Sequence, residues 1–84
     1  MEMQLNIRYR VTKASKGNTF QVGDQVSLDN NGDINVYGKN SGWIDAPDVA
    51  KATDGWEIAV DREWVQGRLA KLRKQVAELE AAIQ

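Results

Sequence analysis

Six apolar residues near the C-terminal end of the chain recur at spacings of 4, 3, 4, 3 and 4 residues. This heptad spacing keeps their side chains on one side of a helix, as in a coiled coil. A helix with one narrow apolar stripe packs against another helix, and the chain has no second long helical pattern. The pattern therefore predicts a homo-oligomer whose interface is the apolar stripe Val65, Leu69, Leu72, Val76, Leu79 and Ile83.

The alternative is a helix that folds against its own sheet, which usually requires a wider apolar face. Charged residues flank the stripe here, and mainly alanines are left to widen it. The sequence therefore favours self-association, with a dimer preferred over a trimer or tetramer. Charge does not decide the orientation of the helices. A parallel pair sets Arg68 near Arg73 of the partner subunit, and an antiparallel pair sets Arg73 near its own copy.

The composition is that of one small globular unit, with 84 residues of which 42% are hydrophobic and 27% are charged. Cysteine is missing, whereas small secreted domains usually carry disulfides. No stretch approaches the roughly 18 apolar residues of a membrane span, and the residues Met1 to Gln4 do not begin a basic and then apolar leader. We therefore expect a cytoplasmic protein with no membrane partner.

The first part of the chain has the period-two pattern of strands. Apolar and polar residues alternate without a break from Met3 to Val11, which predicts a half-buried strand. The segments 20–22 and 26–28 predict two further short strands, separated by a turn at Gly23-Asp24.

The turn that follows can be predicted from strand pairing, because residues that pair across a hairpin point to the same face. A two-residue loop would place Leu28 opposite the polar Asn35. A three-residue loop at 30–32 instead pairs Leu28 with Ile34 and Val26 with Val36. This loop requires Gly32 to adopt a positive φ.

The rest of the chain is predicted to contain a short helix, a last strand and the terminal helix. Asp45 and Asp61 are suited to begin the two helices, and Gly55 can end the first one in a left-handed conformation. Trp64 lies off the apolar stripe, so we expect it to pack back on the strands. The predicted order is a strand at 33–37, a loop at 38–42, the apolar pair Trp43-Ile44, a helix at about 46–53, a strand at 56–60 and a helix from 61 to 84.

The predicted fold class is α+β: a small five-stranded antiparallel barrel or meander with a short helix before the last strand, followed by a C-terminal coiled-coil helix. This layout, with a turn at Val22-Gly23-Asp24-Gln25-Val26, is similar to that of SH3-like barrels. An open sheet covered by a helix is the alternative. We expect two parts, a β-rich domain at residues 1–60 and an amphipathic oligomerisation helix at residues 61–84.

Residues with useful chemistry are few. Histidine and cysteine are both missing, which removes the usual general base, the thiolate nucleophile and the common transition-metal ligands. Asp29, Asn31 and Asp33 have the spacing of the first ligands of a calcium loop, but Ile34 and Asn40 occupy the positions that need glycine and glutamate. We therefore expect no enzyme activity, no metal and no cofactor.

One basic strip is a candidate surface for a partner or for single-stranded nucleic acid. Arg8 and Arg10 share one face of the first strand, Lys13 and Lys16 follow, and aromatic side chains could supply stacking area nearby. The formal net charge of -1 makes nucleic acid the less favoured ligand. The residues of this candidate surface are Arg8, Arg10, Lys13, Lys16, Tyr37 and Trp43.

The sequence thus indicates a small non-enzymatic binding or adaptor protein that presents its β-rich domain in two or more copies, with another protein as partner. The alternative is a structural assembly component with no dissociable ligand. Compact chains with so little chemistry are common among accessory proteins of phages and other mobile elements.

Overall fold

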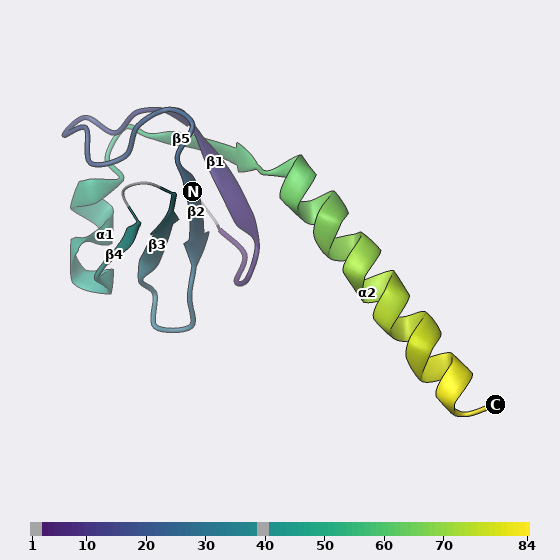
Figure 1. Cartoon of the computed structure of the whole chain (residues 1–84). Coiled ribbons are helices and arrows are strands. Elements are labelled where there is room, and N and C mark those ends of the chain that lie inside the picture. Colours follow the sequence, from purple (N-terminus) through teal and green to yellow (C-terminus); the bar gives the residue numbers. More distant parts are fainter. Residues whose placement is uncertain (1–2, 39–40) are drawn as a thin grey trace.

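A computed structural model describes residues 3–38 and 41–84. Residues 1–2 lie outside the described residues, as do residues 39–40 of the loop predicted at 38–42. The fold is α+β, with one antiparallel sheet, a short helix and a long terminal helix (Figure 1). The elements are β1 (Arg8–Lys13), β2 (Gln25–Leu28), β3 (Ile34–Tyr37), β4 (Gly42–Ile44), α1 (Ala46–Ala52), β5 (Glu57–Val60) and α2 (Arg62–Ala82).

The sheet has five strands in the order β4-β3-β2-β1-β5. Strands β1 to β4 form a meander, and β5 pairs antiparallel with β1 on the other side. The two edge strands, β4 and β5, are not neighbours, so the sheet is open. The predicted five-stranded antiparallel sheet, the short helix before the last strand and the terminal helix are confirmed, whereas closure into a barrel is not.

The hairpin between β2 and β3 has the predicted register. Val26 pairs with Val36 and Leu28 pairs with Ile34. Gly32 has a φ of 83°, and its N–H donates to the carbonyl of Asp29 at 3.1 Å. The choice of the three-residue loop is therefore confirmed, because only that loop brings the apolar residues of both strands to one face.

The strand predicted from Met3 to Val11 is wrong in its first half, since β1 begins only at Arg8. The chain turns at Asn6, which has a φ of 64°. Asparagine tolerates this left-handed conformation better than most residues do. The alternation of apolar and polar residues does not reveal this turn, because it continues unchanged on both sides of Asn6.

The strand predicted at 20–22 is also wrong. Phe20 is fully buried, but Val22 is 68% exposed, and no strand forms there. The hydroxyl of Ser15 accepts a hydrogen bond from the N–H of Phe20, and the carboxylate of Asp24 accepts one from the N–H of Gln21. Local side chains thus satisfy the backbone that a strand would have paired. The predicted turn at Gly23 is present, with a φ of 95°.

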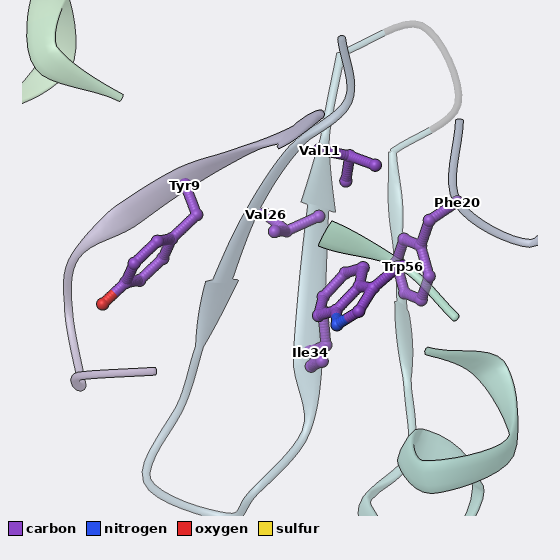
Figure 2. Close-up of a cluster of buried hydrophobic side chains, with 6 residues drawn as sticks. All are labelled: Tyr9, Val11, Phe20, Val26, Ile34 and Trp56. Carbon is purple, nitrogen blue, oxygen red and sulfur yellow. The ribbon is translucent and has the colours of Figure 1, made fainter. Parts of the chain in front are cut away.

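The core lies on one face of the sheet, where Phe20 and Trp56 bring aromatic rings over the strands (Figure 2). Their ring centroids are 4.8 Å apart with an interplanar angle of 48°. The loop at Phe20 therefore covers the same face as the residue that precedes β5. The buried hydrophobic residues of this core are Tyr9, Val11, Phe20, Val26, Ile34 and Trp56.

Helix α1 begins at the predicted place but is capped differently. The side chain of Asp45, its N-cap residue, makes no capping hydrogen bond. Instead the carboxylate of Asp33, in the β2–β3 turn, accepts from the N–H of Ala46 at 2.7 Å. A tertiary contact thus replaces the local cap. Gly55 follows the helix with a φ of 79°, as predicted.

Candidate functional site

The face of the sheet opposite the core carries polar and aromatic side chains. Pairing aligns Arg8 with Ser27 and Asn35 across the first three strands. Arg10 is aligned in the same way with Gln25 and Tyr37. Side chains of paired residues share a face, and Tyr9 and Val11 point to the other face, into the core. The start of α2 lies beside this polar face, and we call this region the sheet–helix junction.

Arg8 is the most constrained side chain of the junction. Its guanidinium carbon lies 3.8 Å from the ring centroid of Tyr37 and 5.7 Å from that of Trp64 on α2. Its Nη1 donates to Oε1 of Gln25 at 3.0 Å. The hydroxyl groups of Tyr37 and Ser27 are in turn 2.7 Å apart. Stacking and hydrogen bonding together hold this cation in one position.

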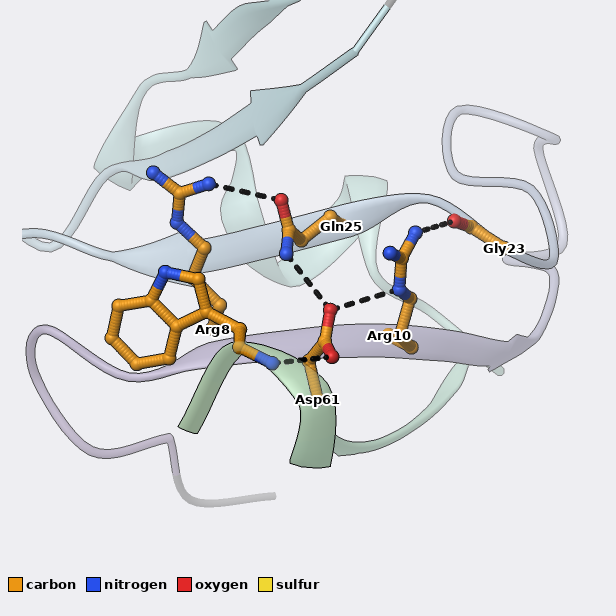
Figure 3. A network of polar contacts seen from close by, with 6 residues as sticks. Arg8, Arg10, Gly23, Gln25 and Asp61 are labelled. Atoms are coloured by element: carbon orange, nitrogen blue, oxygen red, sulfur yellow. Dashed lines mark hydrogen bonds and ion pairs between the residues drawn. The ribbon is translucent and has the colours of Figure 1, made fainter. Parts of the chain in front are cut away.

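Asp61 connects α2 to the same face of the sheet (Figure 3). One carboxylate oxygen accepts from the backbone N–H of Trp64 at 3.2 Å, which confirms Asp61 as the helix N-cap. The other lies 2.9 Å from Nε of Arg10 and 2.8 Å from Nε2 of Gln25. Because Gln25 also accepts from Arg8, a continuous polar network runs from Arg8 through Gln25 and Asp61 to Arg10.

The environment of Asp61 favours its charged form. The residue is only 5% exposed, and its removal from water opposes ionisation. The hydrogen bonds from Trp64 and Gln25 and the adjacent charge and hydrogen bond of Arg10 outweigh this effect and lower the pKa of Asp61 below its ordinary value of 3.8. Asp61 is therefore an ionised structural group, consistent with its role in joining the helix to the sheet.

Two adjoining hollows lie at the sheet–helix junction. One, of about 350 Å³, lies between the polar sheet face and α2 and has Ser27 and Asn35 in its lining. The other, of about 380 Å³, continues along the first turns of the helix. Both include Arg8, Trp64 and Arg68, and the second adds Gly67 and Lys71. The sequence predicted that Trp64 packs against the strands, and its proximity to Arg8 agrees with this.

Arg68 and Lys71 were not identified as site residues from the sequence, which assigned them only to the flank of the stripe. One signal was present, because Trp64, Arg68 and Lys71 are three or four residues apart and therefore share one side of a helix. That this side lies next to Arg8 depends on the direction in which α2 leaves the sheet. No local sequence pattern predicts the direction of α2, because contacts with distant residues of the sheet set it.

The residues of the predicted basic strip have different surroundings in the structure. Arg8 and Tyr37 are brought together, but Arg10 is paired with the buried Asp61. Lys16 lies 3.7 Å from the carboxylate of Asp54, and Lys13 is exposed at the end of β1.

Trp43 pairs with Asn35 across β3 and β4 but lines neither hollow of the sheet–helix junction. It is 67% exposed on the edge strand β4 and donates its indole N–H to Asp45 at 3.1 Å. The hollows that Trp43 lines are shared with Thr19 and Ile44, not with the basic residues. Of the predicted aromatic residues, only Tyr37 therefore belongs to the sheet–helix junction.

The apolar stripe lies on a helix that projects away from the sheet (Figure 1). Val65, next to the sheet, is half-buried. The other five stripe residues are all exposed. Leu72 is the least exposed, at 41%, and Ile83 is the most exposed, at 86%. Within residues 3–38 and 41–84, no segment of the chain covers them. The projection gives the molecule its long axis of 55 Å, against 24 and 23 Å in the other directions.

Neither a metal site nor a membrane span is found in the described part of the chain. The carboxylates that had calcium-like spacing are engaged in the β2–β3 turn. Asp29 accepts from the N–H groups of Asn31 and Asp33 at 2.9 and 3.1 Å, and Asp33 accepts from Ala46.

Comparisons of the chain with protein-family models, with curated proteins and with solved structures find no match. The function is therefore argued from the geometry of this chain alone.

Proposed function

We propose that this chain is a non-enzymatic binding or adaptor protein that presents its strand domain, residues 1–60, in two or more copies through the helix at residues 61–84. The observation that carries this proposal is the exposure of the apolar stripe on α2. Burying one leucine side chain stabilises a protein by about 1.5–3 kcal/mol, so a second copy of the helix would gain substantially by covering the stripe.

Two further features support self-association. The projecting part of α2 makes few contacts with its own sheet, and helices in proteins owe most of their stability to tertiary packing of an apolar face. Gly67 weakens the helix further, by about 1 kcal/mol relative to alanine. Pairing with another copy would stabilise the helix by tertiary packing, so we expect folding of α2 and oligomerisation to be linked.

Anchoring at the start of α2 supports presentation of the strand domain in a defined orientation. Asp61 and Trp64 contact side chains of β1 and β2, so the direction of the helix is tied to the sheet. A coiled coil would then hold the copies of the strand domain at set positions. Such an arrangement binds a repeated or multivalent protein partner by avidity.

The finer details of this proposal are a dimeric coiled coil, an SH3-like strand domain and a cytoplasmic location. The position of β5 beside β1, after a short helix, supports the SH3-like layout. The lack of cysteine supports a reducing compartment. The second candidate function, a structural assembly component, is favoured by the same exposed stripe and differs in having no dissociable partner.

Sedimentation equilibrium of the intact protein tests the proposal. The wild type should be a dimer at micromolar concentration, and Leu72→Asp should be a monomer, because a carboxylate in the seam cannot be buried without a partner. Lys74→Asp is the matched control, since Lys74 lies two residues away and outside the stripe. A wild-type monomer at high micromolar concentration, or equal dissociation of both variants, would overturn the proposal.

A further inference from the structure

Three cations of the sheet–helix junction form no ion pair with the residues that the structure describes. Arg8, Arg68 and Lys71 line the two adjoining hollows, and within the part of the chain that the structure describes none of them forms an ion pair. Arg10 and Lys16, by contrast, face Asp61 and Asp54. The three cations at the junction are therefore a concentration of positive charge in a chain whose formal net charge is -1.

One of these cations is already positioned for recognition. The guanidinium of Arg8 stacks on the ring of Tyr37, lies 5.7 Å from the Trp64 ring centroid and donates one N–H to Gln25. An arginine has five N–H donors, and a fixed guanidinium can bind a carboxylate through two of them at a small cost in side-chain entropy. Arg68 and Lys71, one turn apart on α2, add two further donors beside it.

We infer that the sheet–helix junction is a binding site for a short acidic segment of a partner protein, with carboxylates on Arg8, Arg68 and Lys71 and apolar stems against Trp64. The inference deepens the proposed function by giving the chemistry of the partner. The sizes of the hollows, about 350 and 380 Å³, suit a few side chains. Asn35 lines the first hollow with a partly exposed amide that can bind a peptide backbone.

A nucleic acid fits this site less well. Its affinity comes mainly from the number of phosphates that cations neutralise along a continuous track. The track ends after these three cations, because Arg10 is already paired with Asp61. The face of the Tyr37 ring that is nearest to the site is also covered by Arg8.

The site remains accessible when the proposed coiled coil forms. In the heptad defined by the stripe, Trp64 and Lys71 occupy c positions and Gly67 an f position, which point away from the seam. Arg68 occupies a g position at the flank. Each copy would therefore carry its own junction site, and the two sites of a dimer would be available to one partner.

Fluorescence anisotropy of a labelled, glutamate-rich peptide capped at both ends tests the inference with the intact protein at low ionic strength. The double variant Arg68→Gln, Lys71→Gln should bind the peptide about tenfold or more weakly than the wild type. The double variant Lys13→Gln, Lys51→Gln removes the same charge from other exposed positions and should bind within about twofold of the wild type. Circular dichroism checks that both variants fold.

Three results would overturn the inference: no binding of the peptide up to millimolar concentration, an equal loss of binding in both double variants, or tighter binding of an oligo(dT) strand than of the peptide. The monomeric Leu72→Asp variant separates this test from that of the oligomer. It should bind the peptide with the affinity of a single wild-type site, because the junction residues are all on one chain. The junction site can therefore stand or fail independently of self-association.

Discussion

The carboxylate of Asp61 lies 2.9 Å from Nε of Arg10, so the residue that caps α2 is also paired with a residue of β1 that is aligned with Gln25 of β2. This contact ties the first turn of the helix to the centre of the sheet. Because Arg10 is paired with Asp61, it is not among the cations that are available to bind a ligand. The structural and the candidate binding residues of the junction are therefore neighbours with different roles.

Replacing Asp61 by alanine should destabilise the fold by about 2–3 kcal/mol, because the N-cap bond is lost and the donors on Gln25 and Arg10 lose their buried carboxylate acceptor. Asp54→Ala is the matched control. It removes only the exposed pair with Lys16, which should be worth less than about 1 kcal/mol. Urea denaturation of both variants measures the difference. Equal effects would show that the Asp61 network contributes no more than a surface ion pair.

Protonation of Asp61 should lower the free energy of unfolding at acid pH. Its pKa is lower in the folded than in the unfolded chain, so the unfolded state binds the proton first as the pH decreases. The stabilisation is fully present above the ordinary pKa of 3.8 and is lost as the pH falls through the lowered folded value. Asp61→Asn should flatten this part of the curve of unfolding free energy against pH. Parallel curves for the two proteins would contradict the assignment.

Asp33→Ala should destabilise the protein more than Asp45→Ala does, by a margin of about 1 kcal/mol. The carboxylate of Asp33 caps α1 from the β2–β3 turn, whereas that of Asp45 accepts only from the indole N–H of Trp43 and does not cap the helix. Thermal unfolding of the two variants compares the caps directly. The reverse order would mean that the local N-cap residue is the one that stabilises the helix.

Gly32→Val should cost about 1 kcal/mol or more, because a β-branched residue is strained at the φ of 83° that the turn requires. A Cβ at this position would also lie 3.4 Å from Cβ of Ala46. Gly17→Ala provides a control, since the nearest atom to its added Cβ is 3.9 Å away. Denaturation curves that shift equally for both would argue against backbone strain at Gly32.

Excess calcium should leave the melting temperature unchanged. The oxygens of Asp29 and Asp33 already accept backbone hydrogen bonds, and a ligand that bound the folded state would raise the melting temperature by mass action. Differential scanning fluorimetry with calcium and with magnesium as control measures this. A calcium-specific increase that disappears in Asp29→Asn would show that the turn is a metal site.

Local patterns predicted the parts of this fold that depend on neighbouring residues. The register of the β2–β3 hairpin follows from the need to place Val26, Leu28, Ile34 and Val36 on one face, and the structure confirms it. Asp61 as the N-cap and Gly55 at positive φ are equally local properties. The same reasoning failed at Asn6 and Phe20, where the chain bends without any change in the apolar pattern.

The candidate site was only partly predictable. Arg8 and Tyr37 were identified because they lie on predicted strands with a defined face, whereas Arg68 and Lys71 entered the site through the position of α2. The assignment of Arg10 and Lys16 to the same surface overlooked their carboxylates, since Asp61 and Asp54 are distant in the sequence. Pairing of charges between distant segments is decided when the chain folds.

The sequence by itself determined the α+β class, the hairpin register, the ends of the helices and the apolar stripe of α2, because each depends on residues within a few turns or on one strand pair. The tertiary structure alone decided which basic residues are neutralised, how α1 is capped and where Trp64 meets Arg8. These depend on contacts across 13 to 56 positions, as from Asp33 to Ala46 and from Arg8 to Trp64. They also depend on the direction of α2, which Asp61 ties to the sheet through one ion pair with Arg10 and two hydrogen bonds, to Gln25 and to the backbone of Arg8.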